Sequence, residues 1–291
     1  MVETLETVVI YTVVLGSLYL LVSLGFSLIC GVLRIFHLGY SYIFVATVYL
    51  TWMLMQEFGL GFGPALAGMM VIQAGIAVAA YVGVIKPYLR AEEKMMTALL
   101  LIAIITEQAA LHWYPIEVGV YLPTEISPGT MSIGGAMISR QLVFSAAIAI
   151  AFTIAFIIFF LKSKPGLGAR ALSQDTYVSQ LLGINVERFY VLITIMTLIP
   201  IVIAMLLVAP VWAVDPSMGM GYMTTAILVA VLGGLGNLRG TIAASYVIGF
   251  AHSFVSYVVA EPRFMNLAAL LIVLVVLIAR PQGLARSEAL W

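Results

Sequence analysis

The sequence predicts an all-α membrane protein, a polytopic bundle of about eight or nine transmembrane helices. Two observations predict this fold: 63% of the residues are hydrophobic and only 9% are charged, and the mean hydropathy is +1.15. Soluble domains have roughly 45–50% apolar and about 25% charged residues, so lipid must solvate much of this chain. A third observation, the absence of alternating apolar and polar residues, argues against barrel strands and favours helices.

Nine apolar runs are long enough, or nearly so, to cross the roughly 30 Å hydrocarbon layer as helices. They lie at 8–33, 41–56, 64–85, 97–114, 141–161, 189–209, 222–238, 241–260 and 264–279. The second and seventh runs are short, so we expect broken or re-entrant helices near 34–42 and 233–240. We interpret 1–291 as a single transmembrane domain. Pro200 lies within the sixth run and should kink it.

The basic residues predict an orientation, because cytoplasmic loops of membrane proteins are enriched in Lys and Arg. With the N-terminus outside and nine crossings, eleven basic residues fall on the cytoplasmic side and two outside. The cytoplasmic set is Arg34, Lys86, Arg90, Lys94, Lys162, Lys164, Arg170, Arg188, Arg239, Arg280 and Arg286, and the outer set is Arg140 and Arg263. This orientation places the C-terminus in the cytoplasm. The N-terminus has no basic region typical of a signal peptide.

Two loops stand out. The extracytoplasmic loop at 115–139 is rich in Gly and Pro, which favours an irregular connector with a small hairpin near 132–138. It is either a simple connector or part of a docking surface for an extracytoplasmic partner. The cytoplasmic loop at 162–188 is polar and basic in an otherwise apolar chain, and Pro165 and Gly166 should break the helix before it.

The cytoplasmic loop contains a predicted short helix at 175–182. Asp175 can cap its start, since a carboxylate accepts hydrogen bonds from free amides there, and Gly183 suits the left-handed position that ends it. Asn185 can then cap the following span. Val178, Leu181 and Leu182 fall at i, i+3 and i+4 on one face. So short a helix is unstable alone, so it is either an amphipathic surface connector or a coupling helix that docks on a cytoplasmic motor.

No motor is predicted within this chain. A nucleotide site would need a glycine-rich loop followed by Lys, and no Gly-Lys pair occurs in the sequence. The formal net charge is zero, whereas nucleic-acid-binding proteins carry a basic excess. The three His residues and single Cys fit no zinc spacing. We therefore expect no catalytic residue, no metal site and no cofactor in this chain.

Three stretches resemble one family, the permeases of branched-chain amino-acid ABC transporters. Residues 166–192 are similar to its cytoplasmic loop, G-R-A-x-R-A-x-x-[ED]-D-x-x-x-A-x-L-L-G-I-N-x-D-R. Residues 215–249 resemble its G-G-x-G-[SN]-x-x-G-[AT] stretch, and 280–290 resemble its R-P-x-G-L-x-G tail. The matching residues are Asp175, Leu181, Leu182, Gly183, Ile184, Asn185, Arg188, Gly233, Gly234, Gly236, Asn237, Gly240 and Thr241. The similarity covers nearly the whole chain.

The resemblance implies the shorter permease subunit of an importer in a bacterial or archaeal inner membrane. Such a subunit would move a small amphipathic solute inward by ATP-driven alternating access. The solute would be a branched-chain or hydrophobic amino acid, or a related amide or organic acid. The implied partners are two cytoplasmic ABC ATPases that bind ATP and Mg, a second related permease and an extracytoplasmic solute-binding protein. A heterodimer of permeases is expected, and a homodimer stays open. The alternative function is a self-contained secondary transporter or channel.

The coupling residues implied by the loop are Asp175, Val178, Leu181, Leu182, Gly183 and Asn185. Candidates for the translocation path begin at the 34–42 break, where the family has Ile-Asn-Phe-Ala-His-Gly-Glu. Here His37, Tyr40 and Tyr42 replace its Asn, His and Glu. This difference removes an acidic partner for a substrate ammonium group, so it bears on the choice of substrate.

Two further candidates lie elsewhere. Glu107 is near the middle of the 97–114 span, where a carboxylate costs about 2.5–3.5 kcal/mol on insertion scales. It contacts either the path or a neighbouring helix. The Gly233, Gly234, Gly236 and Asn237 stretch is either a break that lines a cavity or a set of small residues that lets helices pack closely.

Overall fold

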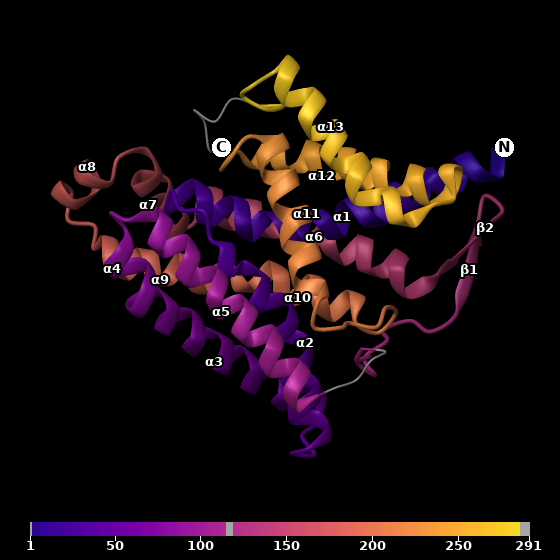
Figure 1. Ribbon diagram of the computed structural model, residues 1–291, viewed down its shortest axis with the longest axis horizontal. Coiled ribbons are helices and arrows are strands. Elements are labelled where there is room, and N and C mark those ends of the chain that lie inside the picture. The colour runs from indigo at the N-terminus through magenta and orange to yellow at the C-terminus, as the bar shows by residue number, and fades with distance from the viewer. Residues whose placement is uncertain (1, 115–118, 286–291) are drawn as a thin grey trace.

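The computed structural model describes residues 2–114 and 119–285 and is almost entirely helical (Figure 1). Eight of its helices are long and apolar enough to cross a membrane, and one shorter apolar helix, α11 (Met218–Gly233), accompanies them among the described residues. The all-α polytopic bundle predicted from the sequence is therefore confirmed. Residues 115–118 of the predicted outer loop and 286–290 of the family-like tail lie outside the described residues.

The first half of the chain contains α1 (Val2–Val32), η1 (Leu38–Tyr40), α2 (Ser41–Gln56), α3 (Phe62–Ala80), η2 (Tyr81–Ile85), α4 (Lys86–Tyr88), α5 (Glu92–Trp113), β1 (Thr130–Ile133), β2 (Ala136–Ser139) and α6 (Arg140–Lys162). The second half contains α7 (Lys164–Gln174), α8 (Thr176–Leu181), α9 (Val186–Met196), α10 (Leu198–Val208), α11, α12 (Leu238–Phe254), η3 (Val255–Val259), η4 (Pro262–Phe264) and α13 (Met265–Ala279).

Helix α1 is the centre of the bundle and packs along α12 more extensively than any other pair of elements. The two helices run in opposite directions, since Thr241 donates to Ser27 near one end and Tyr11 contacts Tyr257 near the other. At the closest approach, a Cβ on Gly249 would lie 2.7 Å from the Gly16 nitrogen. Small residues of this kind let membrane helices approach closely. The outer helices α5 and α13 instead expose most of their residues.

The bundle has two distinct ends (Figure 1). The hairpin end carries the start of α1 and the antiparallel strands β1 and β2, whose presence confirms the hairpin expected near 132–138. The opposite end, here called the α8 end, carries α4, α7 and α8. The α11–α12 connection and the C-terminal segment lie toward the α8 end, because Thr241 is beside Ser27 and the Leu284 amide donates to Leu232. The described parts of the two termini therefore lie at opposite ends of the bundle.

The break expected near 34–42 is present. Helix α1 ends at Val32, the next residues are extended, and a single 3₁₀ turn at Leu38–Tyr40 leads into α2. This segment folds back along α1, since the Tyr40 ring meets the Phe26 ring edge-on at 5.3 Å. A Cβ on Gly39 would lie 2.8 Å from the Leu99 carbonyl oxygen of α5. The break is thus packed inside the bundle.

The break expected near 233–240 is a tight connection between two helices. Helix α11 ends at Gly233 and α12 begins at Leu238. The span predicted at 222–238 lies four to five residues closer to the C-terminus than the observed helix α11. The helix cannot continue past Gly233, because Gly234 and Gly236 have φ angles of +92° and +78°, which favour glycine.

Proline positions explain two further boundaries. The span containing Pro200 is divided at Thr197 into α9 and α10, as expected of a residue that cannot donate a backbone hydrogen bond. The helix break expected at Pro165 is present, and it is followed at once by a further helix. The preceding helix ends at Lys162, and Pro165 lies in the first turn of a new helix, α7, capped by the Ser163 side chain. Proline is favoured in a first turn, because its missing N–H would be unpaired there anyway.

The Gly16–Gly249 contact predicts a cost for a single added methyl group. Gly249→Ala should lower the unfolding stability of the purified protein by about 1–3 kcal/mol, as overpacking does in close-packed cores. The measurement is the thermal unfolding midpoint in detergent. Gly75→Ala in α3 is the control, since a Cβ there meets nothing within 4 Å. Equal midpoints for the two variants would contradict the close approach of α1 and α12.

Candidate functional site

Helix α8 is short, capped at both ends and strongly exposed on one side. The Asp175 carboxylate accepts from the Val178 amide at 2.9 Å, and Gly183 follows the helix with φ at +84°. The local structure that the sequence predicted is therefore present. Leu181 and Leu182 are 70% and 75% exposed and Val178 is 46% exposed, and neighbouring exposed apolar side chains mark an interaction surface.

The segment before α8 is anchored in the bundle. A Cβ on Gly166 would lie 2.1 Å from the Phe160 carbonyl oxygen, and one on Gly168 would lie 2.2 Å from the Phe189 ring. Helix α7 can therefore rest directly on α6 and α9. After α8, the Asn185 side chain accepts from the Arg188 amide at 3.1 Å and caps α9. Helix α8 thus protrudes between two firmly held segments.

Arg34, which lies just after α1, contacts the C-terminal end of α7. Its Nη2 donates to the carbonyl oxygens of Ser173 at 2.8 Å and of Gln174 at 3.4 Å. These are terminal helix carbonyls that lack partners within the helix, and a cation near a helix C-terminus is favourable. Arg34 has a φ angle of +56°, a left-handed conformation that costs a non-glycine residue roughly 1–2 kcal/mol. The contacts with α7 offset part of this cost.

The structure brings His37, Tyr40 and Tyr42 together within or beside the 34–42 break, and all three are buried. The rings of His37 and Tyr40 meet at 6.3 Å, and Tyr40 also contacts Phe44. Among the described residues, His37 Nδ1 and the Tyr40 hydroxyl are buried without a hydrogen-bond partner. Buried polar atoms without partners cost free energy and mark a place where a conformational change or a ligand could satisfy them.

The other two candidate groups lie apart from this cluster. Gly233, Gly234, Gly236 and Asn237 form the α11–α12 connection. A Cβ on Gly234 would lie 2.3 Å from the Ala285 carbonyl oxygen, and the Asn237 side chain accepts from the Gly240 amide at 3.0 Å. Their surroundings are those of a tight helix contact. Glu107 lies two turns beyond Leu99 along α5 and is half-buried.

Glu107 has an acidic neighbour that the sequence did not reveal. Asp215, just before α11, is close enough to interact electrostatically with Glu107, Tyr49 and Tyr222. The Asp215 carboxylate accepts from the Ser217 amide at 2.8 Å, which fixes its place at the helix start. A second carboxylate therefore lies within electrostatic range of Glu107, on the side of the bundle where α2 packs against α5 and α11.

Two irregular segments pair beside this acidic group. Val120 and Val214 form an isolated antiparallel bridge, with N···O distances of 2.9 and 3.0 Å. The Leu122 amide donates to Ala209 at 3.1 Å, and the Tyr49 hydroxyl donates to the Val214 carbonyl at 3.3 Å. Since Tyr49 is midway along α2, this pair reaches well into the bundle. Irregular backbone at such depth requires partners within the protein, and here each segment partners the other.

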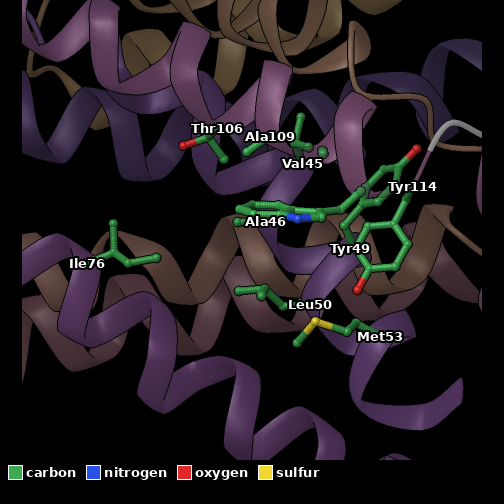
Figure 2. Close-up of a pocket in the computed structure, with 11 residues that line it drawn as sticks. Val45, Ala46, Tyr49, Leu50, Met53, Ile76, Thr106, Ala109 and Tyr114 are labelled. Atoms are coloured by element: carbon green, nitrogen blue, oxygen red, sulfur yellow. The ribbon is translucent and has the colours of Figure 1, made fainter. Parts of the chain in front are cut away.

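A cavity of about 430 Å³ lies between α2, α3 and α5 (Figure 2). Its lining is almost entirely apolar, and the polar groups are confined to the side chains of Thr106, Trp113, Tyr49 and Tyr114. Figure 2 shows Ile76 of α3 at one end of the cavity and Tyr49 and Tyr114 at the other. None of the candidates from the sequence lines this cavity. Among the described residues, no three His, Cys, Asp or Glu side chains gather in a group that could hold a metal ion.

Sequence reasoning missed Arg34, Asp215 and the Val120–Val214 pair. Asp215 had a local signal, since Asp-Pro-Ser before an apolar run is typical of a turn leading into a helix. That signal did not show which side chains would be its neighbours. Arg34 was identified only as a basic residue in a short connection.

Comparisons with known proteins identify a family and a solved structure of similar fold. The family model described as branched-chain amino acid transport system / permease component matches residues 8–279. The branched-chain amino acid transport permease BraD of Pseudomonas aeruginosa is 23% identical over 288 residues, covering 94% of this chain and 93% of that protein. LivH of Escherichia coli K12 is 23% identical over 300 residues, covering 95% and 94%. The solved structure of PsaBC from Streptococcus pneumoniae in complex with Fab has a TM-score of 0.52 at 17% identity, covering 98% and 93%.

The Val120–Val214 bridge predicts that cysteines introduced at these two positions can form a disulfide. Hydrogen-bonded antiparallel pairs have Cα atoms about 5.5 Å apart, within the range of a disulfide. With Cys30 replaced by Ser, Val120→Cys with Val214→Cys should cross-link under mild oxidation, as detected by peptide mass spectrometry. Val120→Cys with Thr224→Cys is the control, since Thr224 is on the exposed face of α11. Equal cross-linking of the two pairs would contradict the observed pairing.

Proposed function

Since this chain belongs to the permease components of branched-chain amino acid transport systems, we propose that it imports a small amphipathic solute by ATP-driven alternating access. The family and the eight apolar helices identify a multi-pass subunit of an inner-membrane ABC transporter. The proposed solute is a branched-chain or other hydrophobic amino acid, or a related amide or organic acid. In this proposal residues 1–291 form one permease domain, and ATP hydrolysis is left to separate subunits.

The proposed orientation has the hairpin end outside and the α8 end in the cytoplasm. It is supported by the positions of the basic residues. Lys86, which pairs with Glu187 at 2.5 Å, and Arg34, which contacts α7, both lie at the α8 end. Arg140 begins α6 directly after the hairpin. Basic residues collect on the cytoplasmic side of membrane proteins.

The observation that carries the proposal is the exposed apolar face of α8. Val178, Leu181 and Leu182 are 46%, 70% and 75% exposed, and the α8 end of the bundle otherwise bears basic loops. Burying one such side chain is worth about 1.5–3 kcal/mol. We therefore assign α8 as the coupling helix that enters a groove on an ATPase subunit. Asp175, Gly183 and Asn185 fix its ends, so movement of the groove would move the helix as a unit.

The proposed assembly contains two ATPases, which hold ATP and Mg, this chain, and a second related permease in a heterodimer. A solute-binding protein would deliver the solute at the hairpin end. The proposed path includes His37, Tyr40 and Tyr42 in the break. For Gly233, Gly234, Gly236 and Asn237, the close approach of Gly234 to Ala285 supports the packing role instead. Glu107 is proposed to contact the solute, and the nearby Asp215 supports this role, because the two carboxylates together favour an ammonium group.

The coupling assignment predicts the effect of charges on α8. Leu181→Asp with Leu182→Asp should abolish co-purification of the ATPase, because apolar anchors at interface centres typically contribute about 2 kcal/mol or more each. The permease itself should keep its thermal unfolding midpoint, since both side chains are exposed. The measurement is affinity purification through a tag on the permease.

The matched control is Gln180→Asp, which adds a charge to the same helix at an exposed polar position. It should leave ATPase binding intact. Normal assembly of the double Asp variant would rule out α8 as the coupling helix.

The path assignment predicts a substrate-dependent effect at Glu107. Glu107→Gln should raise KM for transport of an amino acid by about tenfold or more, since a hydrogen bond to a charged group is worth about 1.5–3 kcal/mol. Transport of a carboxylate solute without an ammonium group should not weaken. Gln108→Ala, the exposed neighbour, is the control. An unchanged KM with a lowered unfolding midpoint would show that Glu107 is a structural residue instead.

A further inference from the structure

Arg34 joins the end of α1 to the segment that carries α8. The guanidinium group donates to the Ser173 and Gln174 carbonyls, the last two of α7. Asp175 follows at once, and it both ends α7 and caps α8. No flexible residue therefore separates the carbonyls that Arg34 holds from the first turn of α8. A displacement of α8 would therefore move the two carbonyls to which Arg34 is bonded.

On its other side, Arg34 begins the 34–42 break, which has little freedom to absorb movement. Ile35 and His37 are buried, and the Phe36 ring meets Phe26 edge-on at 5.3 Å. Gly39 rests against the Leu99 carbonyl of α5, and the Tyr40 hydroxyl occupies the space where Gly25 would have a Cβ, 2.2 Å from that position. A pull at Arg34 would therefore move the aromatic residues of the break against α1 and α5.

A second contact at the α8 end, between α4 and α9, is weaker than the Arg34 contacts. Lys86 pairs with Glu187 at 2.5 Å, but the two side chains are 48% and 55% exposed. Ion pairs this open to solvent contribute little. The Arg34 contact with Ser173 is partly buried and that with Gln174 is exposed, and both engage carbonyls at the C-terminal end of α7, where intrahelical partners are lacking. Packing of α7 on α1 and α9 adds to the connection.

We propose that Arg34 is a positioning residue that transmits movement of the coupling helix α8 to the break at 34–42. The proposal rests on the proposed function, because it takes α8 as the element moved by an ATPase. In this mechanism ATP-driven displacement of α8 strains the C-terminal end of α7 and pulls the guanidinium group. The break then shifts against α5, where buried His37 and Tyr40 have polar atoms without partners in this conformation.

The test uses the full transporter with its ATPase subunits in proteoliposomes. Arg34→Met removes the donors while keeping an unbranched side chain. Arg34→Gly also removes them, and it relieves the left-handed backbone conformation. Both variants should hydrolyse ATP but carry about tenfold less solute per ATP, a typical size for loss of one coupling contact. Arg34→Lys keeps a cation near the α7 carbonyls and should recover part of the ratio.

Two controls separate transmission from other effects. Arg90→Met removes an exposed cation from another connection at the same end and should leave the ratio unchanged. ATPase co-purification should stay normal in every Arg34 variant. Recovery of the ratio by Arg34→Gly but not by Arg34→Lys would overturn the proposal, since the backbone conformation would then matter and the guanidinium group would not.

A parallel fall in transport and hydrolysis, with the ratio unchanged, would also overturn it, because Arg34 would then be a structural residue. Failure of the unmutated chain to bind or use an ATPase has a different meaning. It would refute the proposed function itself, and this inference with it. The Leu181 and Leu182 variants report on ATPase docking, whereas the Arg34 variants report only on the transmission of movement after docking.

Discussion

The constraint on which this structure depends is that lipid offers no hydrogen bonds to the backbone. Each regular helix meets the constraint by itself, so the informative places are those where the helix stops. The break after α1 folds back against α1 and α5. The residues around Val120 pair with those around Val214. The α11–α12 connection is closed by the Asn237 side chain and by the C-terminal segment. Every irregular segment described within the bundle is covered by other parts of the chain.

The features that could be predicted from the sequence are local ones. Helical spans, the cap at Asp175, the left-handed Gly183 and the cap at Asn185 all depend on a few adjacent residues, and each is present. The α7 helix was missed because Pro165 is compatible with either a break or a first turn, and its neighbours did not decide between them. The approach of Asp215 to Glu107 and the bridge between Val120 and Val214 depend on how distant helices pack. No local pattern contains that information.

Packing also divides the bundle into firmly and loosely held parts. Helices α1 and α12 meet through Gly16 and Gly249 with no room for an added methyl group, so they behave as one unit. Helix α8 has almost no contact beyond its neighbours α7 and α9, and its apolar face is open. A protein that works by moving one part against another needs both. In the proposed mechanism α1 and α12 would be the fixed unit, and α8 would be the element on which a partner acts.

The bridge between Val120 and Val214 has a consequence for synthesis. These valines are separated along the chain by the hairpin, by α6 and by all of α7 to α10, so the first partner is made long before the second. Until α10 has been inserted, the backbone around Val120 has no partner within the protein and must stay hydrated. We expect this pairing to be among the last steps of assembly in the bilayer. A ribosome-bound chain truncated before α10 would therefore leave the 119–122 segment open to proteases, and the finished protein would not.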